Sequence, residues 1–285
     1  MLPDKMNLHD KKNKWDDADI FHGGDFHYVH TYLHKNYRHR LHSHGFYEMN
    51  IITRGSGRHY IGDTYVSANV GDVFVIPPDT NHGYYAEEPI DILHILFRRE
   101  FIDRYGEELD RVSGYGLLFD IEPYIRYTTS GRCNLTLDYA ELKTMIRSAN
   151  DIYDTVEKGH YVHANAIGME LICNLAYMMD SEIKRSTSHD DTYYEVMVAM
   201  DYIRNNLDRK ITLDSICREV NVSKATLNRH FRSVLGMSPI DYVTSCRVDM
   251  ADRLLSQGRY SRTEIAQMCG FYDLSHMNKY IQKPI

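Results

Sequence analysis

The sequence predicts a multidomain α+β protein: an N-terminal antiparallel β-barrel with a helical hairpin, followed by a C-terminal all-α domain made of two similar helical pairs. Three observations predict this fold class. Short β-rich runs fill residues 25 to 101, a hydrophobic period of 3.6 begins near residue 135, and the last third contains an imperfect internal repeat. A chain of 285 residues is long enough to bury a core in each domain.

The composition is that of a globular protein without a membrane-spanning segment. Charged residues make up 26% of the chain and hydrophobic residues 43%, an ordinary globular balance. There is no run of about 18 apolar residues, and the N-terminus lacks the pattern of a signal peptide. The five cysteines are scattered, which favours a reducing compartment. We therefore expect a cytoplasmic protein with no membrane partner.

The net charge of −7 is unevenly distributed along the chain. Residues 192 to 285 carry a formal charge of +3, and the residues before them carry −10. An acidic body with a mildly basic C-terminal third is compatible with DNA contact but does not establish it.

The N-terminal part begins with a polar segment of about 25 residues, which we expect to form a loosely ordered arm. The strand candidates that follow it are FHYVHTYL, YEMNIITRG, GRHYIG, TYVSANV, DVFVIPP and IDILHILF. Closely spaced short strands with Gly, Pro, Asn and Asp between them are typical of an antiparallel sandwich or small barrel. We assign residues 1–115 to the arm and the barrel.

Two amphipathic helices follow the barrel. Leu142, Met145 and Ile152 recur at helical spacing behind a capping pair, Asp138 and Glu141. The next helix carries a similar seam from residue 164 to residue 178. Such seams either pack within the chain or pair with a second copy. We assign residues 116–184 to a helical dimerisation region and the polar stretch 185–191 to a linker.

Residues 192–285 contain the repeat, in which SICREVNVSKATLNRHF matches EIAQMCGFYDLSHMNKYI at offsets of 49 and then 50. Asn221 and Gly270 stand where the first helix of each unit ends, and both tolerate a left-handed backbone. Ser223 and Asp273 are good N-caps for the second helix. Each unit is therefore predicted to be a helix-turn-helix. A long helix beginning at Ser238 joins them and sets the second helices about 34 Å apart, one turn of DNA.

The polar face of each second helix indicates its partner. Arg and Asn side chains suit guanine and adenine edges, whereas Lys and Ser suit phosphates. A solvated surface is the alternative, but two units with Asn followed by a base favour double-stranded DNA. The candidate DNA-binding residues are Lys224, Ala225, Asn228, Arg229, Arg232, Ser275, His276, Asn278 and Lys279.

The motifs LGMSPIDYVTSCRVDMADRLL and IAQMCGFYDLSHMNKYIQK resemble the DNA-binding domain of the AraC/XylS family of transcription regulators over residues 193 to 283. The resemblance implies promoter DNA, a small-molecule effector, a second copy of the chain and RNA polymerase as partners. Two features depart from the family pattern: the final glycine turn and helix do not follow, and Met277 and Ile281 replace larger aromatics. We expect the second unit to bind DNA weakly for that reason.

The barrel contains a set of metal-ligand residue types. His42, His44 and Glu48 are expected to project from one face of a strand, with His82 after the neighbouring strand. The spacing resembles the two cupin motifs, with departures at Asn36, Asp79 and Ala86. The resemblance implies a cupin-type sensing domain, in which sugars are common effectors. The four residues suit a divalent metal such as Zn, Ni, Fe or Mn.

Two interpretations of this pocket remain open. In the first, no cofactor is required, and His44, Glu48, His82 and Tyr84 bind a small polar effector, with a sugar as the leading class, for a regulator that is not an enzyme. In the second, the four ligands hold a metal in a cupin enzyme, an isomerase or a dioxygenase, with an appended helical domain. The DNA-binding half favours the regulator.

Overall fold

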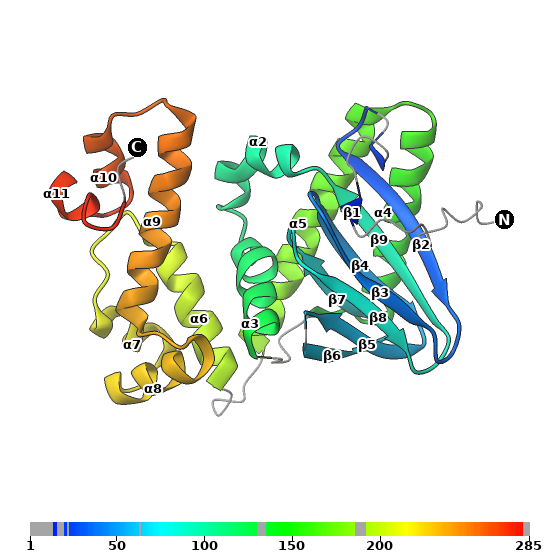
Figure 1. Cartoon of the computed structure of the whole chain (residues 1–285), viewed down its shortest axis with the longest axis horizontal. Helices are drawn as coiled ribbons and strands as arrows, with labels where there is room; N and C mark the ends of the chain where they lie inside the picture. Colours follow the sequence, from blue (N-terminus) through cyan, green and yellow to red (C-terminus); the bar gives the residue numbers. More distant parts are fainter. Residues whose placement is uncertain are drawn as a thin grey trace. The chain divides into compact units, whose positions relative to one another are not determined.

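The computed structural model describes residues 14–15, 20–21, 23–62, 64–129, 135–185 and 192–281. The chain divides into two compact units, Met1–Arg185 and Ser186–Ile285. Figure 1 shows strands with covering helices in the first unit and helices alone in the second. This confirms the predicted fold class. The predicted linker lies almost entirely outside the described residues.

The first unit contains two five-stranded sheets, ordered β1-β3-β8-β5-β6 and β10-β7-β4-β9-β2. Apart from the parallel contact of β1 with β3, the paired strands are antiparallel. The strands are β1 Lys14–Trp15, β2 Phe26–Leu33, β3 Arg38–His44, β4 Tyr47–Arg54, β5 Ser56–Ile61, β6 Thr64–Asn69, β7 Asp72–Ile76, β8 His82–Ala86, β9 Ile90–Phe97 and β10 Leu135–Thr136.

Burial along the strands follows the hydrophobic pattern of the sequence. Every residue of β7 is buried, whereas buried and half-buried residues alternate along β5. One apolar cluster lies inside the barrel and is formed by Leu33, Ile52, Val66, Ala68, Phe74, Tyr84, Ala86, Ile90 and Ile92. The barrel therefore has a packed interior, into which its polar pocket is set.

The six predicted strands are all present, and the structure has four strands outside that prediction: the two-residue strands β1 and β10, and the longer strands β3 and β8. β3 has the sequence RHRLHSH, and β8 has the sequence HGYYA. Both are rich in histidine or tyrosine, and neither shows the alternation of apolar and polar residues that marks a half-buried strand. They are also the strands that carry three of the four predicted metal ligands.

Helices of the first unit begin with α2 (Arg99–Leu109), a π-helix (Leu117–Ile121) and α3 (Glu122–Thr129). The predicted hairpin then follows as α4 (Tyr139–Glu157) and α5 (Tyr161–Arg185), and Asp138 forms the expected capping box with Glu141. Both helices contact β2. Their seam residues Met145, Ile152 and Leu175 are fully buried within a single chain. The seams therefore complete the core of the unit.

A buried ion pair holds α3 against the barrel. The Arg126 guanidinium donates to the Glu122 carboxylate, with Nε to Oε1 at 2.7 Å, and to the backbone carbonyl of Val75 in β7 at 2.6 Å. Both side chains are buried, with exposed fractions of 3% and 1%. Arg126 also lies beside His59, whose Nδ1 is 3.4 Å from Nη1. The helix is therefore joined to the interior of the barrel by hydrogen bonds as well as by apolar packing.

The second unit consists of α6 (Thr192–Arg204), α7 (Leu213–Val220), α8 (Lys224–Leu235), α9 (Pro239–Gln257), α10 (Arg262–Met268) and α11 (Leu274–Met277). The predicted helix ends are confirmed. Asn221 and Gly270 have φ values of 55° and 70°, and Ser223 and Asp273 cap α8 and α11. The second recognition element is shorter than predicted, because α11 ends at Met277. Among the described helices, none has the length and apolar character needed to cross a membrane.

Replacing Arg126 with Met is expected to lower the free energy of unfolding by about 3–5 kcal/mol, because it leaves the Glu122 carboxylate buried and unpaired. Chemical denaturation of the full chain measures this. Replacing Glu122 with Leu in the same chain should recover most of the loss, since both buried charges are then removed. Equal stability of the single and double variants would contradict this account.

Candidate functional site

Four side chains converge inside the barrel. His42 and His44 come from β3, Glu48 from β4 and His82 from the first residue of β8, and one ligand atom of each lies within 4.8 Å of the others. The prediction that His42, His44 and Glu48 share one strand is wrong. The chain turns after His44, so that Glu48 belongs to the opposite sheet. The residues meet because both sheets enclose the same interior.

Local irregularity in β3 sets the direction of the histidines. The pairing of β3 with β8 shifts between His39 and His42, and His42 then lies directly opposite His82. Such a bulge inserts an extra residue and redirects the side chains that follow it. As a result, the rings of His42 and His82 have centroids 4.4 Å apart.

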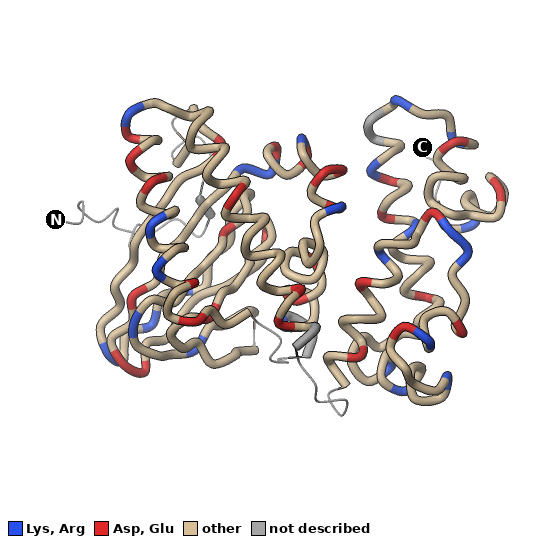
Figure 2. The backbone as a smooth tube through the Cα atoms, turned by 180° about the vertical axis from the view of Figure 1, so that it is seen from behind, with Lys and Arg blue, Asp and Glu red and all other residues tan. Residues whose placement is uncertain are grey.

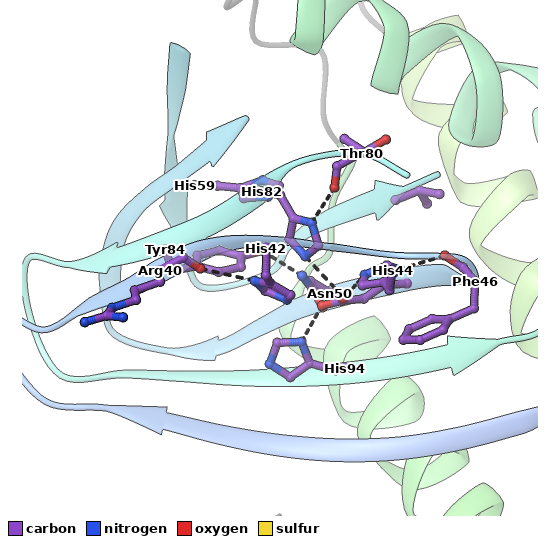
Figure 3. Close-up of polar contacts among 12 residues, drawn as sticks. Arg40, His42, His44, Phe46, Asn50, His59, Thr80, His82, Tyr84 and His94 are labelled. Atoms are coloured by element: carbon purple, nitrogen blue, oxygen red, sulfur yellow. Dashed lines mark hydrogen bonds and ion pairs between the residues drawn. The ribbon is translucent and has the colours of Figure 1, made fainter. Parts of the chain in front are cut away.

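Backbone carbonyl groups fix the orientation of all three rings. The Nδ1 atoms of His42, His44 and His82 lie 3.2, 2.8 and 3.0 Å from the carbonyl oxygens of Arg40, Phe46 and Thr80 (Figure 3). A carbonyl oxygen only accepts, so each Nδ1 carries the hydrogen. Each Nε2 therefore faces the interior of the barrel.

Glu48 is the centre of the cluster. Its Oε2 lies 2.6 Å from His44 Nε2 and 3.2 Å from His82 Nε2, and its Oε1 lies 2.6 Å from Nδ1 of His94. Burial alone raises the pKa of the Glu48 carboxyl group. The neighbouring His82 and the hydrogen bonds from the histidines outweigh burial and hold that pKa well below its usual range. The cluster therefore presents an ionised carboxylate to the pocket.

The histidines keep unused coordination capacity. Burial, together with the nearby His82, lowers the pKa of His42 to about 3, so its ring is neutral. Among the described residues, the Nε2 atom of His94 is buried without a hydrogen-bond partner, and that of His82 faces Glu48 Oε2 at 3.2 Å. Imidazole nitrogens and a carboxylate oxygen suit Zn, Fe, Ni or Mn, and a carbonyl group behind each ring is the usual support of a metal-bound histidine. The residues present thus fit a divalent metal.

A pocket surrounds the cluster. Its polar side includes Thr31 and Tyr84 in addition to the histidines, and its apolar side is formed by Ile20, Val29, Leu33, Phe46, Ile92 and Leu96. The Tyr84 hydroxyl accepts a hydrogen bond from Asn50 Nδ2 at 2.9 Å, and burial raises the pKa of this phenol. The cavity measures about 30 Å³, enough for about two water molecules.

Two histidines of this interior were not predicted from the sequence. His94 lies in β9 between Leu93 and Ile95, and a single histidine within an apolar strand is the sequence feature that could have indicated its place in the pocket. His59 is fully buried and stacks on Tyr84 with ring centroids 4.5 Å apart. Burial, reinforced by the charge of Arg126, lowers the pKa of His59. These residues extend the polar interior from the pocket to α3.

The candidate DNA-binding residues lie on the surface of the second unit. Lys224, Ala225, Arg229 and Arg232 of α8 are exposed, and Asn228 is half-buried, with its amide donating to the Lys224 carbonyl oxygen. Beneath them, Leu227 and Phe231 are fully buried. The helix therefore has the predicted division into an apolar inner face and a polar outer face.

In the second unit of the repeat, two of the predicted DNA-binding residues form hydrogen bonds within the protein. Ser275, Asn278 and Lys279 are exposed, and Asn278 accepts a hydrogen bond from Arg262 at 2.7 Å. The predicted contact residue His276 is half-buried, and its Nδ1 accepts from the backbone amide of Tyr272 at 3.3 Å. His276 therefore helps to shape the turn. Figure 2 shows Lys and Arg distributed along the helices of this unit, interspersed with Asp and Glu.

Comparison with known protein families identifies both halves of the chain. Residues 27–171 match the model of the AraC-like ligand binding domain, and residues 216–284 match a helix-turn-helix domain. The chain belongs to the AraC family of transcription regulators. It is thus a regulator with a ligand-binding domain and a DNA-binding domain, and it is not an enzyme.

Curated relatives agree with this assignment. The HTH-type transcriptional activator RhaS of Pectobacterium carotovorum subsp. carotovorum is 22% identical over 244 residues, covering 85% of this chain and 83% of its own. RhaR of Escherichia coli (strain K12) is 23% identical, covering 83% and 80%. Among solved structures, an apo ToxT variant from Vibrio cholerae aligns with 90% of this chain and 92% of its own at 12% identity and a TM-score of 0.40.

Proposed function

We propose that this AraC-family chain is a cytoplasmic, ligand-responsive activator whose barrel senses a small polar effector and whose two helix-turn-helix units bind promoter DNA. The cluster around Glu48 carries the proposal. It places an ionised carboxylate inside the domain that matches a ligand-binding model, beside a buried imidazole nitrogen of His94 that has no hydrogen-bond partner among the described residues. Buried polar groups without partners are costly, and a bound ligand satisfies them. The related activators support activation rather than repression.

The lining of the pocket indicates the class of effector. Imidazole, carboxylate and phenol groups form one side, whereas aliphatic side chains and Phe46 form the other. A sugar or sugar derivative has this two-sided character, with hydroxyl groups that donate and accept and with C–H groups that pack on apolar surface. We therefore propose His44, Glu48, His82 and Tyr84 as the effector-binding residues.

A ligand of that size requires the cavity to open. Ile20 lines the pocket and packs with Phe21, Val29, Phe46 and Leu96. On the C-terminal side of these residues, Arg98 donates to the carbonyl oxygens of Phe21 and Gly24. We propose that this segment moves when the effector enters and that the movement distinguishes the ligand-bound state.

A divalent metal is a second occupant that these residues fit. His42, His44, Glu48 and His82 would hold it, and the metal would supply a charged centre for oxygen atoms of the effector. The chain's own contribution is the orientation of the donors: the carbonyl groups of Arg40, Phe46 and Thr80 turn each imidazole inward. The regulatory proposal does not depend on this occupancy.

The remaining partners follow from exposed surfaces. The exposed residues of α8 and α11 are proposed to contact successive major grooves of promoter DNA. A homodimer is proposed to use the outer faces of α4 and α5, because their seams are buried within the chain. Tyr139, Val162 and Tyr177 lie on those faces with exposed fractions of 77%, 87% and 52%. RNA polymerase is the expected partner of an activator.

Metal binding is expected to be saturable at one Co²⁺ per chain in the chelator-treated full-length protein. Replacing His82 with Ala should weaken Co²⁺ affinity by at least about 10–100-fold. Loss of a group that only supports a metal ligand has an effect of that size, and His82 is itself a proposed ligand. Calorimetry and the visible absorption of Co²⁺ measure this. His34→Ala, which removes an exposed histidine, is the control. If both variants bind alike, the cluster is not a metal site.

Effector binding is expected to improve when Ile20 is replaced with Ala, because the smaller side chain leaves more room in the cavity. A thermal-shift panel of monosaccharides and sugar acids on the full chain identifies the ligand, and calorimetry gives its dissociation constant. Val66→Ala, which shortens a buried side chain of the main apolar cluster, controls for general loosening. An unchanged constant in Ile20→Ala would exclude this segment as the barrier.

Substitutions of base-contacting and phosphate-contacting residues are expected to change DNA binding in different ways. Arg229→Ala should reduce discrimination between a selected operator and a random duplex by about 1–3 kcal/mol, whereas Lys279→Ala should weaken both and lower the salt slope by about 1. Fluorescence anisotropy over a salt series measures both quantities. Lys35→Ala removes one exposed charge from the barrel, where it pairs with Glu88, and should change neither. Equal effects of all three variants would contradict the proposed DNA surface.

A further inference from the structure

A carboxylate and a histidine meet behind the polar face of α8. Glu195, in the helix α6 that opens the second unit, accepts a hydrogen bond from Nδ1 of His230 at 2.5 Å. The two side chains are only 10% and 14% exposed. A largely buried carboxylate requires a partner, and His230 supplies it. The pair joins α6 to the helix proposed to enter the major groove.

The hydrogen bonds determine which nitrogen of His230 carries the hydrogen. Nδ1 donates to the Glu195 carboxylate. The other ring nitrogen, Nε2, lies 3.4 Å from Nη2 of Arg229. A guanidinium group only donates, so Nε2 accepts from it and carries the lone pair. Glu195, His230 and Arg229 thus form one chain of donors and acceptors, ending at an exposed guanidinium.

This series of hydrogen bonds ends at Arg229, a side chain proposed to contact DNA bases. Arginine is long, and fixing it in one rotamer costs conformational entropy. Side chains at neighbouring positions on a helix normally point in different directions. The Arg229 guanidinium must therefore bend toward His230 to contact its ring, and this contact restricts where the guanidinium points. An arginine that is already oriented loses less entropy when it forms the two hydrogen bonds to a guanine edge.

We propose that Glu195 and His230 are positioning residues that orient Arg229 for base recognition. This inference rests on the proposed DNA-binding role of α8. His230 then differs from the neighbouring residues proposed to contact DNA. Its ring orients the Arg229 guanidinium through a hydrogen bond and does not itself need to contact a base. Glu195, on a different helix, is then also a determinant of sequence specificity.

A purely structural role is the competing explanation, because the pair also ties two helices together. The two explanations differ in their dependence on Arg229. A structural tether affects folding and all DNA binding whether or not Arg229 is present. A positioning pair acts only through Arg229, so its removal has no effect on specificity once Arg229 is gone.

The experiment uses the full chain and a duplex enriched by it from a random-sequence pool, with an unenriched duplex as the reference. The specificity ratio is the quotient of the two dissociation constants, and thermal unfolding is followed in parallel. His230→Leu and Arg229→Ala are each expected to lower the ratio by about tenfold, and the double variant should fall no further than Arg229→Ala alone. Glu195→Leu should behave like His230→Leu.

Two variants sharpen the test. Glu195→Gln keeps an oxygen that accepts from Nδ1 and should retain most of the specificity ratio. Ser233→Ala changes an exposed residue of α8 whose hydroxyl donates to the backbone carbonyl of His230 and leaves the contacts of the His230 ring in place, and it should have no effect. Additive losses in the double variant, or loss of stability with an unchanged ratio, would overturn the positioning role. Failure of the wild-type chain to enrich any sequence would instead contradict the proposed DNA reading itself.

Discussion

The first unit depends on one buried carboxylate. Glu48 is 4% exposed, and a charge in such a position is tolerated only with close hydrogen-bonding partners. His44 and His94 each lie 2.6 Å from its oxygens, and β3, β4 and β9 all supply residues to this arrangement. The same interactions that stabilise the charge keep donor groups together inside a barrel that would otherwise be filled by aliphatic side chains. The pocket therefore exists because the fold satisfies this group.

In both units, a hydrogen-bond acceptor fixes the orientation of a histidine ring. In the barrel, three backbone carbonyl groups fix the tautomer and direction of three imidazole rings. In the DNA-binding unit, the Glu195 carboxylate fixes His230, and the ring in turn contacts Arg229. Groups held in this way lose little freedom when a ligand binds, which favours both affinity and selectivity. In both units, buried or half-buried polar groups thus contact the side chains proposed to bind a ligand or DNA.

Local sequence signals predicted much of the fold and part of the site. The capping box at Asp138, the left-handed residue Asn221 and the cap at Ser238 all depend on neighbouring residues, and each is confirmed. The strands β3 and β8 were missed because their histidines and tyrosines conceal the period of two. The contacts of His94 with Glu48 and of Glu195 with His230 depend on pairing between distant segments, which no local pattern encodes. The placement of Glu48 on the same strand as His44 failed because a turn of two residues separates them.

We propose that ligand binding at Glu48 and DNA binding are coupled in one chain. The most direct measurement is the dissociation constant of the full chain for its enriched duplex, with and without a saturating sugar found by thermal shift. In the wild-type chain the ligand should change this constant by about 5–150-fold. In Glu48→Gln, which keeps the size of the side chain but removes its charge, the ligand should have no effect. An equal response of the two proteins would contradict the account.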